Sequence, residues 1–178
     1  DGTVAHVYAR GYGVHGPDGR PRRMIGAMLD ITARKESEQA LRDSEERLRM
    51  ALDGGQIGTW DWDLKTDGLR WGGHAARVFD FEPGVAPTRF EDFLALVHPE
   101  DRPAVDEAVR HAIIHGLPLE IEFRTDAATA DLGRWIAAQG QAYGDDRGEP
   151  VRMLGVMQDI TERKRLESQF LQAQKMEG

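Results

Sequence analysis

Apolar and polar residues alternate with the two-residue period of a β-strand in the second and last thirds of the chain. Trp60–Leu64 and Leu119–Arg124 show this alternation most clearly. Successive side chains of a strand point to opposite faces, so each segment has one apolar face that favours burial. Strand-like segments also cover residues 69–71, 134–143 and 151–158. The pattern therefore predicts five strands between residues 60 and 158.

The segments between these strands have the spacing of helices. Val105, Val109 and Ala112 recur every three to four residues, which places them on one face of a helix that starts near His98 and stops before Gly116. Shorter helices are expected over residues 74–79 and 90–96. Two strands, several helices and then three strands predict an α+β fold, a five-stranded antiparallel sheet with its helices on one face.

Charged helices are predicted on both sides of this domain. Residues 33–52 are rich in strong helix formers without glycine or proline, and Leu41 and Leu48 lie one heptad apart. This thin apolar seam favours a coiled coil of two chains, and a solvated linker helix is the alternative. Residues 162–178 form the other helix, whose apolar positions include Leu166, Phe170 and Ala173.

A block of sequence occurs twice. Gly26–Lys35 returns as Gly155–Lys164, an offset of 129 residues, and each copy leads from an apolar segment through Asp-Ile-Thr into a charged helix. Residues 1–32 read as two strands around a Pro-Asp-Gly turn, which matches the end of the second copy. We therefore expect the last strands of a truncated upstream domain at 1–32. A linker helix at 33–52, a complete domain at 53–161 and an output helix at 162–178 follow.

The composition argues against several classes of function. The net charge of −8 argues against a nucleic-acid partner, because phosphate binding needs a clustered basic face. The absence of cysteine excludes disulfides, thiolate metal sites and cysteine nucleophiles. No apolar segment approaches the roughly 20 residues of a membrane span. We expect a cytoplasmic segment without membrane contact.

Two apparent catalytic patterns are weak. Gly11–Gly16 fits the GxGxxG dinucleotide pattern, but a turn and a strand follow it where that pattern requires a helix. A second group of ionisable residues contains candidates for a metal site or for the active site of a small hydrolase. These residues are His98, Glu100, Asp101, His111 and His115. A metal site needs at least three converging ligands. We interpret the cluster as a helix start and two surface histidines, and expect no metal.

Residues 53–161 resemble a PAS domain, of the subtype with His98-Pro99-Glu100-Asp101-Arg102 before the long helix and Asp159-Ile160-Thr161 at the exit. The resemblance implies a sensory or dimerisation module that passes its state to the following helix. Residues 169–178 resemble the start of the dimerisation helix of bacterial sensor histidine kinases. This implies a homodimer, kinase domains in the same parent chain and no kinase activity in this fragment. A non-sensing PAS spacer and a cyclase or chemoreceptor output are the alternatives.

The expected relay residues are the two Asp-Ile-Thr motifs: Asp30, Ile31, Thr32, Asp159, Ile160 and Thr161. Asp and Thr side chains can cap a helix, and the isoleucine can anchor the junction in the core. A cap alone would also explain these residues. In either interpretation, the motif joins the last strand to the output helix.

Apolar residues could line a ligand cavity or simply fill a core. The candidates are Trp60, Trp62, Trp71, Phe79, Phe93, Val105, Val109, Phe123 and Trp135. Haem is bound in PAS domains through a histidine on the long helix, and alignment places Val105 there, which argues against haem. Without cysteine, covalent flavin photochemistry is excluded, and a non-covalent flavin stays open. The sequence names no ligand.

Overall fold

The computed structural model describes residues 4–81, 84–126 and 133–176. The chain divides into two compact units, one up to Arg49 and one from Met50 onward. The first unit contains β1 (Val7–His15) and β2 (Pro21–Asp30), followed by α1 (Thr32–Gly54), which runs across the division. No helix among the described residues is long and apolar enough to cross a membrane.

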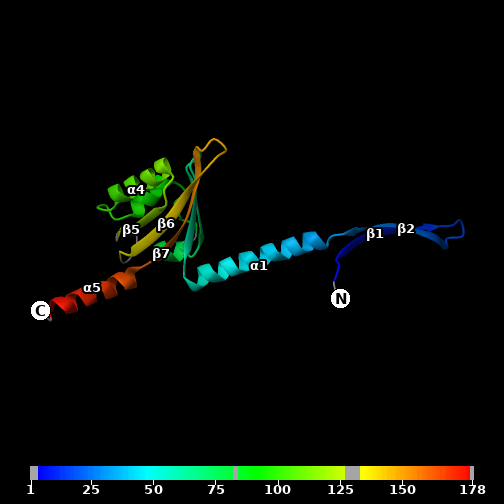
Figure 1. The fold of residues 1–178 in the computed structure, drawn as a ribbon, viewed down its shortest axis with the longest axis horizontal. Helices are drawn as coiled ribbons and strands as arrows, with labels where there is room; N and C mark the ends of the chain where they lie inside the picture. Colours follow the sequence, from blue (N-terminus) through cyan, green and yellow to red (C-terminus); the bar gives the residue numbers. More distant parts are fainter. Residues whose placement is uncertain (1–3, 82–83, 127–132, 177–178) are drawn as a thin grey trace. The chain divides into compact units, whose positions relative to one another are not determined.

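The second unit begins with two strands and three helices and ends with three strands and a helix. These elements are β3 (Gly58–Asp63), β4 (Gly68–Gly73), α2 (Ala75–Phe79), α3 (Phe90–Leu96), α4 (Arg102–His115), β5 (Leu119–Arg124), β6 (Trp135–Gly144), β7 (Pro150–Asp159) and α5 (Thr161–Met176). The strands form one antiparallel sheet in the order β4-β3-β7-β6-β5 (Figure 1). This confirms the predicted α+β fold with a five-stranded antiparallel sheet.

The helices α2 and α4 bury their apolar positions against the inner face of this sheet. Val78, Val105 and Val109 share one core cluster with Phe123 and Ile136 of the strands. Ile136 and Phe123 are among the most completely buried side chains of the described residues. One face of the sheet thus carries the core, as the alternating pattern predicts.

The long helix starts later than the sequence indicated. Asp101 and Arg102 donate backbone hydrogen bonds to the carbonyl of His98, so the residues before Arg102 form a turn. Pro103, and not Pro99, occupies the first helical turn. Backbone N–H groups in that turn have no partner within the helix, so a proline there costs no hydrogen bond. The helix ends where predicted, since Gly116 adopts a left-handed conformation (φ 64°) that favours glycine.

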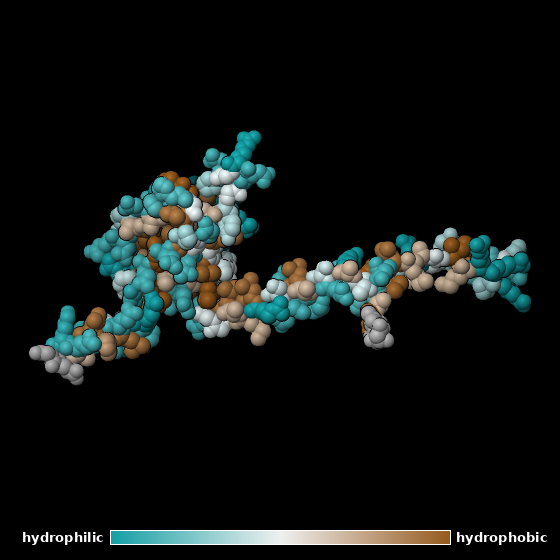
Figure 2. All heavy atoms as spheres, in the orientation of Figure 1, coloured by the Kyte–Doolittle hydropathy of each residue, from teal (hydrophilic) through white to brown (hydrophobic). Residues whose placement is uncertain are grey.

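The β1–β2 hairpin repeats the β6–β7 hairpin residue for residue. Val7 pairs with Asp30 as Ile136 pairs with Asp159, and both hairpins have a register shift at equivalent positions, before His15 and before Gly144. Their exposure differs: Met24 is 82% exposed, whereas its equivalent Met153 is fully buried. Apolar side chains therefore lie open among charged ones on this hairpin (Figure 2).

Candidate functional site

A small apolar cavity lies between the inner face of the sheet and the helices. Seven residues predicted from the sequence line it: Trp60, Trp62, Trp71, Phe79, Phe93, Val109 and Phe123. Further lining comes from Leu69, Phe90, Leu119, Ile121, Ala138, Met153 and Met157. All of these side chains are apolar except for the indole N–H groups. Each of these N–H groups has a partner, because Trp71 donates to the carbonyl of Pro87, Trp62 to the carboxylate of Asp67 and Trp60 to the carbonyl of Val156.

Two of the predicted cavity residues lie elsewhere. Val105 is buried in the core but does not line the cavity. Trp135 lies on the opposite face of the sheet, because its neighbour Ile136 points into the core and strand side chains alternate. On that outer face, the Lys164 ammonium lies 5.1 Å from the centre of the Trp135 ring. Trp135 thus lies at the start of β6 in contact with the exit helix and does not line the cavity.

Trp60 fills space that two glycines leave open. A methyl group built on Gly140 would lie 2.5 Å from two carbons of the Trp60 ring, and one on Gly155 would also overlap the indole. Gly140 and Gly155 pair across β6 and β7, so together they form a flat slot for the ring. The glycines that could have opened a ligand site instead accommodate an aromatic side chain.

The remaining cavity has a volume of about 40 Å³. Ligand pockets for drug-sized molecules are roughly 300–1,000 Å³. Neither a flavin ring system nor a porphyrin fits into this packing. His111 and His115, the histidines of the long helix, are exposed and do not line the cavity. In the described arrangement, the cavity suits only a very small apolar ligand.

The exit junction is built from the Asp-Ile-Thr motif. Asp159 accepts hydrogen bonds from the backbone N–H and the hydroxyl of Thr161, at 2.9 and 2.5 Å. The Thr161 hydroxyl oxygen accepts from the backbone N–H of Trp135 at 3.0 Å, and Ile160 donates to the Trp135 carbonyl. Ile160 is buried. The motif therefore caps α5 and at the same time fastens it to the first residue of β6.

The first junction makes the same contacts. Asp30 accepts from the N–H and hydroxyl of Thr32, Thr32 accepts from His6, and Ile31 donates to the His6 carbonyl. These hydrogen bonds lower the pKa of Asp30. His6 is the equivalent of Trp135 at the offset of 129 residues. The same backbone connection thus occurs twice, with different side chains around it.

The first turn of α5 also binds the outer face of the sheet. Lys164 and Arg163 both form ion pairs with Glu122 of β5. Lys164 is the main cause of the lowered pKa of Glu122. Because Lys164 also lies over the Trp135 ring, the helix is held by side chains as well as by its cap.

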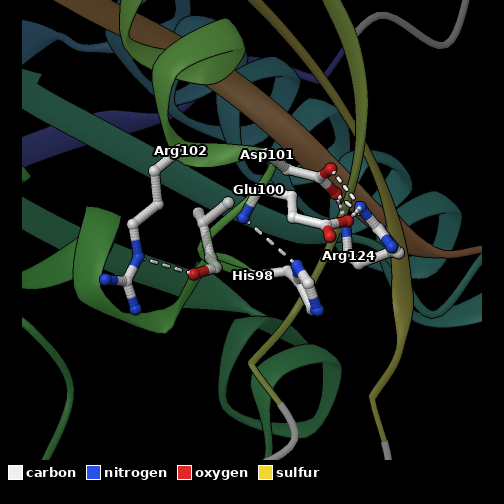
Figure 3. A network of polar contacts seen from close by, with 6 residues as sticks. His98, Glu100, Asp101, Arg102 and Arg124 are labelled. Carbon is white, nitrogen blue, oxygen red and sulfur yellow. Dashed lines mark hydrogen bonds and ion pairs between the residues drawn. The ribbon is translucent and has the colours of Figure 1, made fainter.

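The His98–Arg102 segment forms a network of ion pairs and hydrogen bonds (Figure 3). Asp101 and Glu100 point toward Arg124 at the end of β5, with the Asp101–Arg124 contact at 2.6 Å. The Arg124 guanidinium lowers the pKa of the Asp101 carboxyl, and the two carboxylates raise the pKa of Arg124. Arg102 donates to the carbonyls of Val97 and Ala95. The segment therefore ties the start of α4 to the sheet.

This arrangement leaves the candidate metal or hydrolase residues without a common site. Glu100 and Asp101 bind Arg124, while the rings of His111 and His115 lie 4.4 Å apart on the exposed side of α4. Among the described residues, no three metal-ligating side chains converge. The carboxylates hold the fold together and do not form a cleft with the histidines.

Sequence reasoning missed Arg134. Its guanidinium lies 3.8 Å from Asp159 and donates to carbonyls of α2. A single arginine before a strand has no periodic signal, so only its three-dimensional neighbours distinguish it. Phe90, which stacks on Trp62 at 4.5 Å between ring centres, was missed because short helices have little periodicity.

Comparison with known proteins is consistent with this geometry. A family model described as "PAS fold" matches residues 69–157. The chain is 30% identical over 155 residues to the probable diguanylate cyclase DgcE of Escherichia coli K12, covering 87% of this chain and 14% of that protein. It is 32% identical over 122 residues to the sensor protein FixL of Bradyrhizobium diazoefficiens, covering 68% of this chain and 24% of FixL.

A solved structure agrees with these relatives. The structure of a sensory box histidine kinase/response regulator from Burkholderia thailandensis has a TM-score of 0.61 and 30% identity, covering 73% of this chain and 96% of that one. The family match, the sheet order and the capped exit helix together show that the chain belongs to the PAS family.

Proposed function

We propose that this chain is the sensory and dimerisation module of a two-component sensor histidine kinase. The similarity to FixL and to the Burkholderia kinase structure supports this output. A ligand or partner that prefers one conformation would shift the population of the module, and the Asp-Ile-Thr junction would pass that shift to α5. Catalysis would belong to other domains of the parent protein.

The observation that carries the proposal is the construction of the exit junction. Asp159 caps the start of α5, and Thr161 ties that start to Trp135 of β6. Lys164 anchors the same helix to Glu122 on the sheet. A displacement of β5 or β6 would therefore change the position of α5. A helix attached only by a flexible linker could not report such a displacement.

Dimerisation is proposed to use α1. None of its residues is buried, and Leu41 and Leu48 lie exposed one heptad apart. Pairing two copies of the helix would bury this seam in the manner of a coiled coil. We place the module in the cytoplasm, where a kinase has access to ATP.

The domain organisation proposed is the last strands of an upstream PAS domain at 1–32, a linker helix at 33–52, a PAS domain at 53–161 and an output helix at 162–178. The matching registers and turns of the two hairpins support the first of these assignments. In both turns, equivalent glycines, Gly19 and Gly148, have positive φ.

Two alternatives have specific support. The similarity to a probable diguanylate cyclase covers 87% of this chain, so a cyclase output is consistent with the same module. The cavity of about 40 Å³ favours a PAS spacer that transmits position without binding a ligand of its own. Both alternatives retain the PAS fold and the exit junction.

The test is an activity measurement on the full-length parent protein. Purified protein is incubated with radiolabelled ATP, and in parallel with GTP, and phosphoryl transfer to the protein and cyclic dinucleotide formation are measured. Phosphorylation of the protein supports the kinase output. Formation of a cyclic dinucleotide with no phosphorylation of the protein rejects the kinase output in favour of the cyclase.

An Asp159→Ala variant then tests the junction. Coupling between sites is typically worth a change of about fivefold or more, and we expect a change of that size in the output rate. Asp146→Ala is the matched control, because Asp146 lies in the exposed β6–β7 turn. Equal rates in the two variants would reject the junction as a relay.

A further inference from the structure

Arg134 connects two elements that are separate in the sequence. Its Nη1 donates to the backbone carbonyls of Arg77 and Val78, at 2.7 and 3.2 Å. The same nitrogen lies 3.8 Å from the Asp159 carboxylate, and Nη2 lies 3.7 Å from Asp80. One guanidinium thus joins the last turn of α2 to the exit motif.

The end of α2 that Arg134 holds is also part of the cavity. Phe79 follows Val78 directly and lines the cavity. Its ring packs against Trp71 and Phe93, with ring centres 5.6 and 5.9 Å apart. A movement of Phe79 therefore moves the carbonyls that Arg134 binds, because they belong to the same short helix.

The first copy of the junction shows that the cap does not need this arginine. At the offset of 129 residues, the equivalent of Arg134 is Ala5. Nevertheless, Asp30 and Thr32 form the same hydrogen bonds as Asp159 and Thr161. The cap therefore forms without an arginine, and the contacts of Arg134 to α2 are additional to it.

Arginine is suited to this position. A planar guanidinium presents five donors in a fixed fork, so it can bind carbonyls and a carboxylate at the same time. The last carbonyls of a helix lack intrahelical partners and accept such donors readily. Lysine would offer a point charge without this geometry.

We propose that Arg134 is a positioning residue that couples the cavity to the exit helix, by holding the α2 carbonyls beside Asp159. The inference rests on the sensory role proposed above, since it describes how a change at the cavity would reach α5. Displacement of Phe79 shifts α2, Arg134 follows its carbonyls, and the Asp159 cap of α5 moves with it.

The experiment uses the 178-residue chain labelled with 5-fluorotryptophan. The chain has four tryptophans, and two of them report the two ends of the route. Trp71 touches Phe79 in the cavity, and Trp135 donates its backbone N–H to Thr161 at the junction. Fluorine NMR spectra are recorded with and without Phe79→Leu, and single Trp→Phe variants assign the signals.

We expect Phe79→Leu to shift both the Trp71 and the Trp135 signals in the otherwise unchanged chain. In the Arg134→Gln background, the Trp71 shift remains and the Trp135 shift is lost. The control is Arg110→Gln, since Arg110 is an exposed arginine that pairs with Asp106 on α4. It should preserve both shifts.

The proposal is overturned if Phe79→Leu shifts the Trp135 signal as much in the Arg134→Gln background as in the otherwise unchanged chain. It is also overturned if Phe79→Leu alone does not shift the Trp135 signal. If Arg134→Gln does not fold, Arg134→Lys retains the charge without the fork and should weaken the Trp135 shift. An undiminished shift in Arg134→Lys would then overturn the proposal. Because the fluorine signals report on the PAS domain and not on an enzymatic output, this result is independent of whether the parent protein is a kinase.

Discussion

Removing the Trp60 side chain should open the core at a site that cannot close again. The ring lies over Gly140 and Gly155, which have no side chains to move into the space. The backbone of both glycines is held in the β6–β7 ladder. Trp60→Ala should therefore leave most of the indole volume as a void.

The size of the effect follows from this geometry. Trp→Ala substitutions in a core lower the free energy of unfolding by about 3–5 kcal/mol. Because Trp60 is only partly buried, we expect a loss of about 3 kcal/mol at this position. With a urea m-value of about 2 kcal/mol/M, the unfolding midpoint should fall by about 1.5 M. Free indole at ten times its Kd should restore about 1.4 kcal/mol to the variant.

Urea unfolding followed by circular dichroism measures these changes, and Trp135→Ala is the control. Trp135 is also a tryptophan but lies on the outer face, where loss of its contact with Lys164 should cost about 1 kcal/mol or less. Indole should not restore its stability. Equal losses in both variants, or equal stabilisation of wild type by indole, would refute the reasoning.

A double-mutant cycle tests the slot directly. Gly140→Ala places a methyl group against the Trp60 ring, and such overpacking typically costs about 1–3 kcal/mol. In the Trp60→Ala background that overlap is absent, so the same substitution should cost much less. Additive effects of the two substitutions would show that the ring does not occupy the slot.

Three further predictions concern the surface and the junction. Asp101 has a lowered pKa from its ion pair, so its stabilisation is complete above the unfolded value of about 3.9 and is lost as pH falls through the folded value. Between pH 4 and 2 the urea midpoint of wild type should therefore fall more steeply than that of Asp101→Asn, and parallel profiles would contradict this. Glu122→Gln removes the charge that Lys164 binds and should speed amide hydrogen exchange in the first turns of α5. Unchanged protection there would mean that the cap alone holds the helix. Leu41→Glu combined with Leu48→Glu should convert a dimer into a monomer in light scattering, and a retained dimer mass would exclude the α1 seam as the interface.

The main elements could be predicted because their signals are local. The alternation in Leu119–Arg124 predicted the bounds of β5, and the residues of α3 were also predicted in full. The start of α4 was misplaced because two prolines, Pro99 and Pro103, both fit a first helical turn. Only the turn closed by the His98 carbonyl distinguishes them.

The sequence by itself determined the α+β order, the repeated exit motif and the aromatic composition of the core. These depend on periodicity, capping residues and side-chain types, which are properties of neighbouring residues. Only the tertiary structure decided that Trp60 occupies the space above Gly140 and Gly155, that Trp135 faces outward and that Arg134 reaches α2. Each of these contacts joins strands or helices distant in the chain, and the side chain that reaches a given space depends on strand register and packing.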